Sequence, residues 1–192
     1  YGENQELEYG GDLNQKDKSK RNLKDFEKYY FSNFPPKKLI KYGIKERDLI
    51  EYNFPKLKNI KKEDFDIRFF SHYHNWDPQE NYFYCINNTN LHPNTERSEG
   101  TYSRYASLDD KFDGFHFYLA YIKFGTGRAH SDAAQEVRTG KITREEAVEL
   151  IKKYDSEFPK LYFKEFLEYC EITEKHFFEI INSWRSPHLW TK

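Results

Sequence analysis

The sequence predicts a mainly α-helical protein with very little sheet. Apolar residues recur every three or four positions through its second half, the spacing that places them on one face of a helix. Only two valines occur, and no Val/Ile/Leu run of the kind that forms a central parallel strand is present. The 17 Phe, 16 Tyr and 3 Trp supply much of the apolar surface available for a core. We therefore expect a helical array packed around aromatic side chains.

The first half of the chain is predicted to be less regular. Residues 1–22 are polar and rich in glycine and charge, as expected for a loop. Residues 23–108 are expected to form a mixed connecting region. Its patterns predict four short elements, namely helices over 23–31, 36–42 and 79–87 and a strand over 66–73.

Residues 109–192 are predicted to form a helical domain, with about five helices. A helix carrying Phe163, Phe166 and Leu167 is expected after Pro159. Three further apolar stripes at helical spacing define its core. They are Phe112/Phe115/Leu119/Ile122, Ala147/Leu150/Ile151/Tyr154 and Phe177/Ile180/Ile181/Trp184.

Capping residues mark the expected helix ends in this domain. Gly125 and Gly127 end the first helix, because glycine accepts the left-handed conformation common after a helix. Glu146 follows Thr143 by three residues, the spacing of a capping box. The expected N-caps are Ser131 or Asp132, then Thr143, and finally Thr173.

Charge and cysteine content narrow the functional class. The 31 basic and 32 acidic residues give a formal net charge of −1, which argues against a nucleic-acid-binding domain despite the many Lys and aromatic residues. Cys85 and Cys170 stand far apart, as expected for reduced thiols. No signal peptide and no long apolar run occur, so we expect a cytoplasmic protein without membrane contact. The absence of any Met, even at position 1, leads us to expect a piece of a longer protein.

Two loops carry residues suited to ligand binding. Lys123 and Arg128 flank a Gly-Thr-Gly turn between two helices, where backbone amides and two cations can surround a phosphate. The alternative is a glycine-ended helix hairpin with solvated cations. Glu99 and Tyr102 lie in a second glycine loop that can contact a sugar or a metal-bound phosphate, or can be ordinary surface.

Two further patterns give weaker indications of a site. His72 and His74 would share one face of a strand, with Asp77 nearby, but no third ligand has suitable spacing, so no metal is predicted. Glu3 and Asn4 lie beside a glycine, in the kind of position where α/β proteins keep ligand contacts after a strand.

The segment 123–155, KFGTGRAHSDAAQEVRTGKITREEAVELIKKYD, resembles the C-terminal region of bacterial N-acetyl sugar amidotransferases. So do the run EGTYSRYASLDDKFDGFHFYLAYIKFG from Glu99, the triplet WDP at Trp76, and the opening YGEN with EYGG at 8–11. The resemblance is collinear over most of the chain and is most specific in 123–155.

The resemblance implies an ATP-dependent enzyme. Such enzymes activate the acetamido group of a free or nucleotide-linked N-acetyl sugar and let ammonia displace the leaving group. The product is an acetamidino sugar for bacterial surface polysaccharide, including lipopolysaccharide, or for nonulosonic acids. A separate glutaminase subunit is the implied source of ammonia.

The family's nucleotide site is missing from this sequence. The family binds ATP and Mg²⁺ in a pyrophosphatase-type α/β domain with an SGGxDS loop, preceded by cysteine pairs. Neither SGG nor CxxC occurs here. We therefore expect the C-terminal half only: a helical array attached to the tail end of that α/β domain, whose sheet is mostly absent from the chain. ATP and Mg²⁺ are expected to bind mainly to the N-terminal part, so this chain alone should be inactive.

The resemblance also implies roles for particular residues. Lys123 and Arg128 would be catalytic, stabilising the departing pyrophosphate. Substrate or nucleotide contacts are expected from five further residues, Glu3, Asn4, Glu99, Tyr102 and Arg138. The alternative function is a non-catalytic helical module that docks a partner such as the glutaminase.

Overall fold

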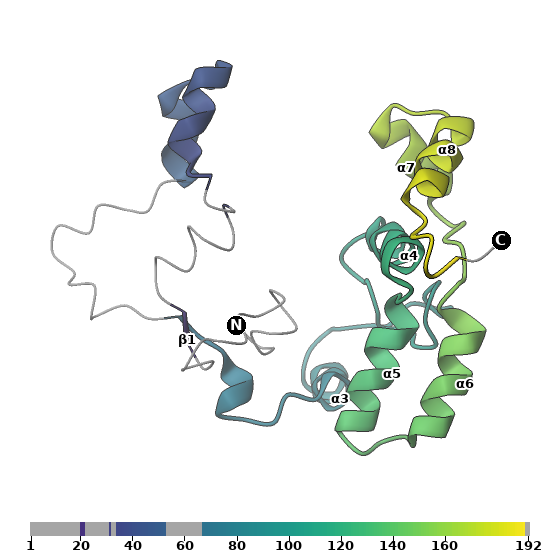
Figure 1. Cartoon of the computed structure of the whole chain (residues 1–192). Coiled ribbons are helices and arrows are strands. Elements are labelled where there is room, and N and C mark those ends of the chain that lie inside the picture. Colours follow the sequence, from purple (N-terminus) through teal and green to yellow (C-terminus); the bar gives the residue numbers. More distant parts are fainter. Residues whose placement is uncertain (1–19, 22–30, 32–33, 53–66, 191–192) are drawn as a thin grey trace, which may run out of the picture. The chain divides into compact units, whose positions relative to one another are not determined.

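The computed structural model describes residues 20–21, 31, 34–52 and 67–190. The helix predicted over 23–31 and almost all of the predicted loop 1–22 lie outside these residues. Contacts divide the chain into two units, Tyr1–Trp76 and Asp77–Lys192 (Figure 1). The second unit therefore contains not only the predicted helical domain but also the helix and the loop that precede it.

The described part of the first unit consists of short elements. Strand β1 (Lys20–Arg21) pairs antiparallel with β2 (Ile67–Arg68), so that Lys20 lies opposite Arg68. Two 3₁₀ helices, η1 (Pro36–Tyr42) and η2 (Glu46–Tyr52), follow one another along the chain and contact each other. Gly43, with φ of 93°, ends η1. Short, largely exposed elements of this kind agree with the irregular composition of the region.

The strand predicted over 66–73 is wrong beyond Arg68. Residues Phe70–His72 form a 3₁₀ turn, η4, closed by the bond from the Tyr73 amide to the Phe70 carbonyl at 2.8 Å. The ring of His74 stacks on Phe70 at 5.5 Å, a contact that the helical path permits and an extended strand would not. His72 and His74 therefore do not share the face of a strand.

The second unit is an array of helices. Its five helices after residue 109 and its lack of described strands confirm the predicted mainly helical fold. The elements are α3 (Pro78–Asn88), α4 (Asp113–Phe124), α5 (Arg128–Arg138), α6 (Arg144–Tyr154), α7 (Phe163–Cys170) and α8 (Glu174–Trp184). Helices α5 and α6 lie side by side, and α4 contacts both α5 and α8 (Figure 1).

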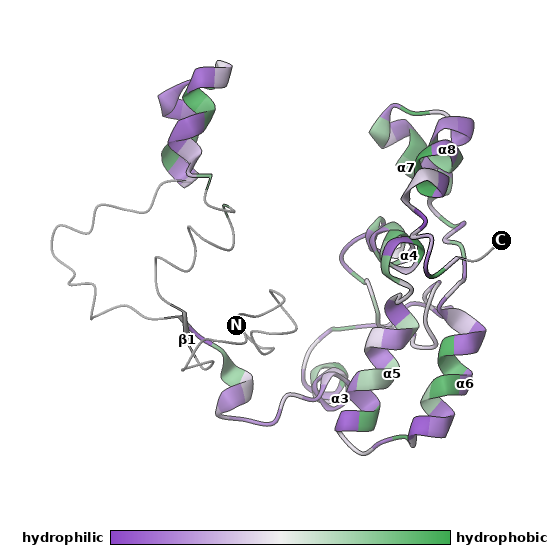
Figure 2. Cartoon of the chain, in the orientation of Figure 1, coloured by the Kyte–Doolittle hydropathy of each residue, from purple (hydrophilic) through white to green (hydrophobic). Residues whose placement is uncertain are grey.

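An aromatic cluster joins α4, α7 and α8. Phe115 and Ile122 of α4 pack against Phe177 and Ile181 of α8, and all four are at most 3% exposed. The Phe115 ring stacks on Phe166 of α7 with a centroid distance of 4.2 Å. Figure 2 colours stretches of these three helices green, which marks hydrophobic residues. The predicted stripes of α4 and α7 are confirmed as core.

The end of the α8 stripe departs from prediction. Trp184 is 47% exposed, and Ile180 is only partly buried. The indole of Trp190 packs on Tyr121 at 5.1 Å, and its Nε1 donates to the Ile122 carbonyl at 2.7 Å. The tail after α8 thus folds back onto the end of α4 and packs Trp190 against it.

Most predicted caps are confirmed. Gly125 ends α4 in the left-handed conformation, with φ of 79°. Thr143 and Glu146 form the full capping box, and the Thr173 hydroxyl accepts from the His176 amide. The prediction that Ser131 or Asp132 caps α5 is wrong, because α5 already begins at Arg128.

Candidate functional site

The N-terminus of α5 is capped by a side chain from a distant part of the chain. The Asp155 carboxylate, in a residue only 4% exposed, accepts from the Gly127 amide at 2.8 Å and the His130 amide at 2.9 Å. A Cβ at position 127 would lie 2.9 Å from the Asp155 Oδ1, so glycine is required there. The amides expected to face a phosphate thus hold a protein carboxylate.

Asp155→Ala is expected to lower the free energy of unfolding by about 2–3 kcal/mol, because it removes the cap and leaves two enclosed amides without an acceptor. Asp155→Asn should cost less, since its amide oxygen still accepts one bond. Urea unfolding of the 192-residue chain measures both. Equal stability of wild type and Asp155→Ala would contradict the capping role.

Arg128, the first residue of α5, is held by two carboxylates. Its Nε donates to Asp132 Oδ1 and its Nη1 to Asp113 Oδ2, each at 3.0 Å. The guanidinium also lies over the Phe117 ring at 4.7 Å from the centroid. No described residue accepts a hydrogen bond from Nη2. One cation between two carboxylates leaves the cluster with a formal charge of −1, so it is not simply a positive anion site.

Hydroxyl groups complete this cluster and join it to the loop before α4. The Thr101 hydroxyl, in a fully buried residue, donates to Asp132 Oδ2 at 2.6 Å. The Ser107 hydroxyl donates to Asp113. The Ala129 amide donates to the Gly100 carbonyl at 3.0 Å. The glycine loop at 99–107 and the start of α5, predicted as separate candidate sites, are therefore one structural unit.

A second, half-buried charge pair fixes the same loop. Arg97 donates from Nη1 and Nη2 to the Glu157 carboxylate, each at 2.7 Å. The Gly100 amide donates to the same carboxylate at 2.7 Å. The hydrogen bonds from Arg97 lower the pKa of the Glu157 carboxyl. The Arg97 guanidinium also covers the Tyr154 ring at 4.7 Å. The loop is thus anchored to the segment that follows α6.

Lys123 lies apart from this network. Its ammonium is 5.3 Å from the Phe124 ring centroid and 5.8 Å from that of Trp184. Arg128 covers Phe117, and Phe117 and Phe124 are seven residues apart on α4, an axial rise of roughly 10 Å. The two predicted catalytic cations therefore contact rings two helical turns apart.

Tyr102 faces a carboxylate of α5. Its hydroxyl lies near Glu136 without the close, aligned geometry of a full hydrogen bond. Burial raises the pKa of Tyr102 far above its usual value, and Glu136 adds to the shift. Burial likewise raises the pKa of the Glu136 carboxyl; the Tyr102 hydroxyl acts in the opposite direction, and repulsion from Asp132 adds to the rise.

Glu136→Gln is expected to stabilise the chain at neutral pH by less than about 1 kcal/mol, because glutamine carries no charge to desolvate. The folded state holds the Glu136 proton more tightly than the unfolded chain. Wild-type stability therefore falls as pH rises through the raised pKa, and the advantage of glutamine should vanish below the ordinary carboxyl pKa. Melting curves across pH 3–8 test this, with exposed Glu145→Gln as control; a pH-independent difference would contradict it.

The other predicted site residues are more dispersed. The Glu99 carboxylate accepts from the amides of Lys160 and Leu161, at 3.0 and 3.1 Å. The Arg138 guanidinium, at the end of α5, binds the Gln135 side chain at 2.5 Å. Glu3 and Asn4 lie outside the described residues. In the part of the chain that the structure describes, no three His, Cys, Asp or Glu side chains form a group that could hold a metal.

A cleft of about 610 Å³ lies beside the anchored loop. Its walls come from residues 94–99 and 106–111 and from residues 159, 161 and 162. Phe115 and Pro159, both buried, form part of its floor. Glu99 is the predicted site residue that lines it.

Residues 99–192 match the family described as "LPS biosynthesis protein WbpG-like, C-terminal domain". Because of this similarity, residues 99–192 are called the WbpG-like domain. The matched region contains the anchored loop and all five helices from α4 to α8. No curated protein matches the chain. The match confirms the predicted relation for the C-terminal half and supports a role in lipopolysaccharide biosynthesis.

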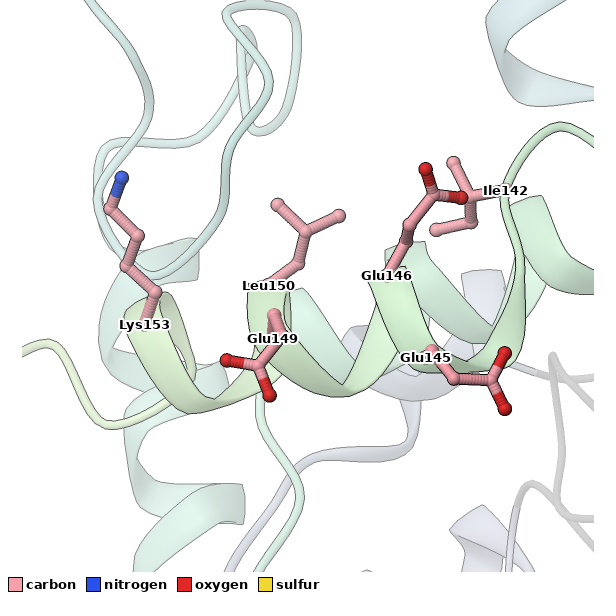
Figure 3. A pocket seen from close by; sticks show the side chains of 6 residues that line it. All are labelled: Ile142, Glu145, Glu146, Glu149, Leu150 and Lys153. Carbon is pink, nitrogen blue, oxygen red and sulfur yellow. The ribbon is translucent and has the colours of Figure 1, made fainter.

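The WbpG-like domain has a further pocket along α6, of about 560 Å³. Ile142 and Leu150 provide its apolar surface, and charged side chains edge it (Figure 3). These are Glu145, Glu146, Glu149 and Lys153. It contains no predicted site residue. None of the described helices, in this domain or before it, is long and apolar enough to cross a membrane.

Sequence reasoning missed the residues that organise the WbpG-like domain. Asp113 lies in the first turn of α4, where a carboxylate favours the helix dipole, so its position in the sequence does not mark it as a partner of Arg128. The spacing of Arg128 and Asp132, four apart on one helix, was the available signal for their pairing. No local signal connects Asp155 with Gly127 or Arg97 with Glu157.

Proposed function

We propose that the chain is the C-terminal part of an ATP-dependent amidotransferase. It converts the acetamido group of a free or nucleotide-linked N-acetyl sugar into an acetamidino group, for surface-polysaccharide or nonulosonic-acid synthesis. The observation that carries the proposal is the collinear resemblance over residues 99–155, which lies inside the matched WbpG-like domain.

The proposed reaction has two steps. The acetamido oxygen attacks the α-phosphorus of ATP, which releases pyrophosphate and leaves an O-adenylated imidate. Ammonia, supplied by a glutaminase subunit, adds to the imidate carbon and displaces AMP. The sugar therefore exchanges its carbonyl oxygen for nitrogen, and that oxygen leaves in AMP.

Within this proposal, ATP and Mg²⁺ belong to an N-terminal nucleotide domain, and the WbpG-like domain closes the site. Arg128 is the residue best suited to meet the departing pyrophosphate, since Asp113 and Asp132 fix its orientation while Nη2 keeps its donors. The negative charges of Asp113 and Asp132 also weaken the electrostatic attraction between Arg128 and an anion. Preorganisation is therefore the stronger argument for this residue.

The fate of the acetamido oxygen tests the proposal. The complete enzyme, ATP, Mg²⁺, ammonium and an N-acetyl sugar labelled with ¹⁸O in the acetamido group are incubated together. Mass spectrometry should find the label in AMP and an acetamidino product. Unlabelled AMP, or release of ADP and phosphate instead, would exclude this mechanism.

The 192-residue chain alone is expected to show no saturable ATP binding, because the sequence lacks a phosphate-binding loop and Asp155 occupies the amides at the start of α5. Isothermal titration calorimetry with ATP and Mg²⁺ measures this. Micromolar affinity in this chain would mean that the nucleotide site is assigned to the wrong half of the enzyme.

A further inference from the structure

The cleft beside the anchored loop has no cation free to bind an anion. Its two cationic side chains, Arg97 and Lys111, are already paired. Arg97 binds Glu157 at 2.7 Å, and Lys111 binds Glu165 at 2.9 Å while lying over the Tyr162 ring at 5.1 Å. Phosphate groups of a nucleotide therefore find no compensating charge in this cleft.

Carboxylates, in contrast, are available. Four line the cleft, and two of them are used locally: Glu99 by the amides of residues 160 and 161, and Asp110 by the Phe112 amide at 2.7 Å. Asp109 and Glu96 make no hydrogen bond or ion pair with any described residue. Both are exposed, and they line the cleft from two different segments, 94–99 and 106–111.

The walls that carry these carboxylates are fixed. The Ser98 hydroxyl donates to the Ala106 carbonyl at 2.8 Å, which ties one wall to the other. Arg97 donates to the Thr101 carbonyl at 2.7 Å. Buried Phe115 and half-buried Tyr162 add apolar surface. The cleft thus presents negatively charged hydrogen-bond acceptors beside an apolar floor.

We propose that this cleft binds the protonated acetamidino group of the product sugar, an inference that rests on the proposed function. An amidine is a strong base and carries a positive charge at neutral pH. Its planar array of N–H donors pairs with a carboxylate as the Arg guanidinium does. Asp109 and Glu96 supply that carboxylate, and the apolar floor accepts the methyl group.

Such a site separates product from unreacted substrate by charge. The acetamido group of the substrate is neutral and has a single N–H donor. It can donate one hydrogen bond to Asp109 or Glu96, whereas the acetamidinium offers paired N–H donors and adds the attraction of opposite charges. The cleft therefore binds the amidinated sugar and not ATP.

A matched pair of sugars tests the inference. The 192-residue chain is titrated with 2-acetamidino-2-deoxyglucose and with N-acetylglucosamine, which differ only in the group that the reaction changes. NMR shifts should place the amidino sugar in the cleft, with a dissociation constant at least about tenfold lower than that of N-acetylglucosamine. Added salt should weaken binding of the amidino sugar but not binding of N-acetylglucosamine.

Variants of the cleft carboxylates test which of them bind the amidino sugar. Asp109→Asn and Glu96→Gln should each reduce affinity for the amidino sugar several-fold and leave N-acetylglucosamine unchanged, while Glu145→Gln on α6 should change neither. Equal binding of the two sugars, shifts outside the cleft, or insensitivity to both cleft variants would overturn the inference. The titration measures binding only. A negative titration would therefore exclude the cleft as the product site without contradicting the proposed reaction, which the ¹⁸O experiment tests independently.

Discussion

Replacing Phe115 with alanine is expected to lower the free energy of unfolding by about 3–5 kcal/mol. The Phe115 side chain is 1% exposed and lies at the centre of the cluster between α4, α7 and α8. Its ring stacks on Phe166 and meets Phe177 edge-on at 6.4 Å. Alanine would leave a cavity among rings that cannot easily close it. The melting temperature should fall by more than about 10 °C.

The same helix offers a matched control. Phe124 is 62% exposed at the other end of α4. Phe124→Ala removes the same atoms from the same helix but should cost under about 1 kcal/mol, because little surface returns to water. Similar losses in the two variants would show that helix propensity, and not burial in the cluster, sets the stability of α4.

Arg128→Ala in the complete enzyme is expected to lower kcat by about a hundredfold, the range for loss of a group that stabilises transition-state charge. Substrate affinity should change less. Stability should also fall, by about 1–2 kcal/mol, because Asp113 and Asp132 lose their shared cation while each is only about one quarter exposed. Steady-state kinetics and melting curves measure the two effects independently.

Two further variants decide how Arg128 acts. Arg128→Lys should not restore kcat, since an ammonium cannot reproduce two directed bonds and a free Nη2. Asp132→Asn breaks the pairing but keeps the guanidinium, so it should affect kcat less than Arg128→Ala. If it lowers kcat equally, Arg128 positions the loop and does not contact the pyrophosphate. Normal kcat in folded Arg128→Ala would remove Arg128 from the site and weaken the case for Lys123.

The sequence by itself determined the helices of the second unit. The stripes of α4 and α7, the glycine end of α4 and the Thr143 and Thr173 caps were all predictable. Each depends on residues three or four apart, so the interaction that stabilises the element is already present in the local sequence. The family resemblance also needed no tertiary structure, because its most specific part is the continuous segment 123–155.

Only the tertiary structure decided which groups pair across the fold. Asp155 caps α5, whose N-cap residue Gly127 lies four residues before the nearest predicted cap, Ser131. Trp190 packs on α4, whereas Trp184, which was expected in the core, is 47% exposed. The two candidate loops proved to be one network, in which Arg128 is compensated by Asp113 and Asp132. The bonds from His130 to Asp155, from Trp190 to Ile122 and from Arg97 to Glu157 join residues 25 or more positions apart along the chain. Hydrogen bonds and charge pairs of this kind depend on where packing brings the backbone, and no periodicity in the sequence encodes that position.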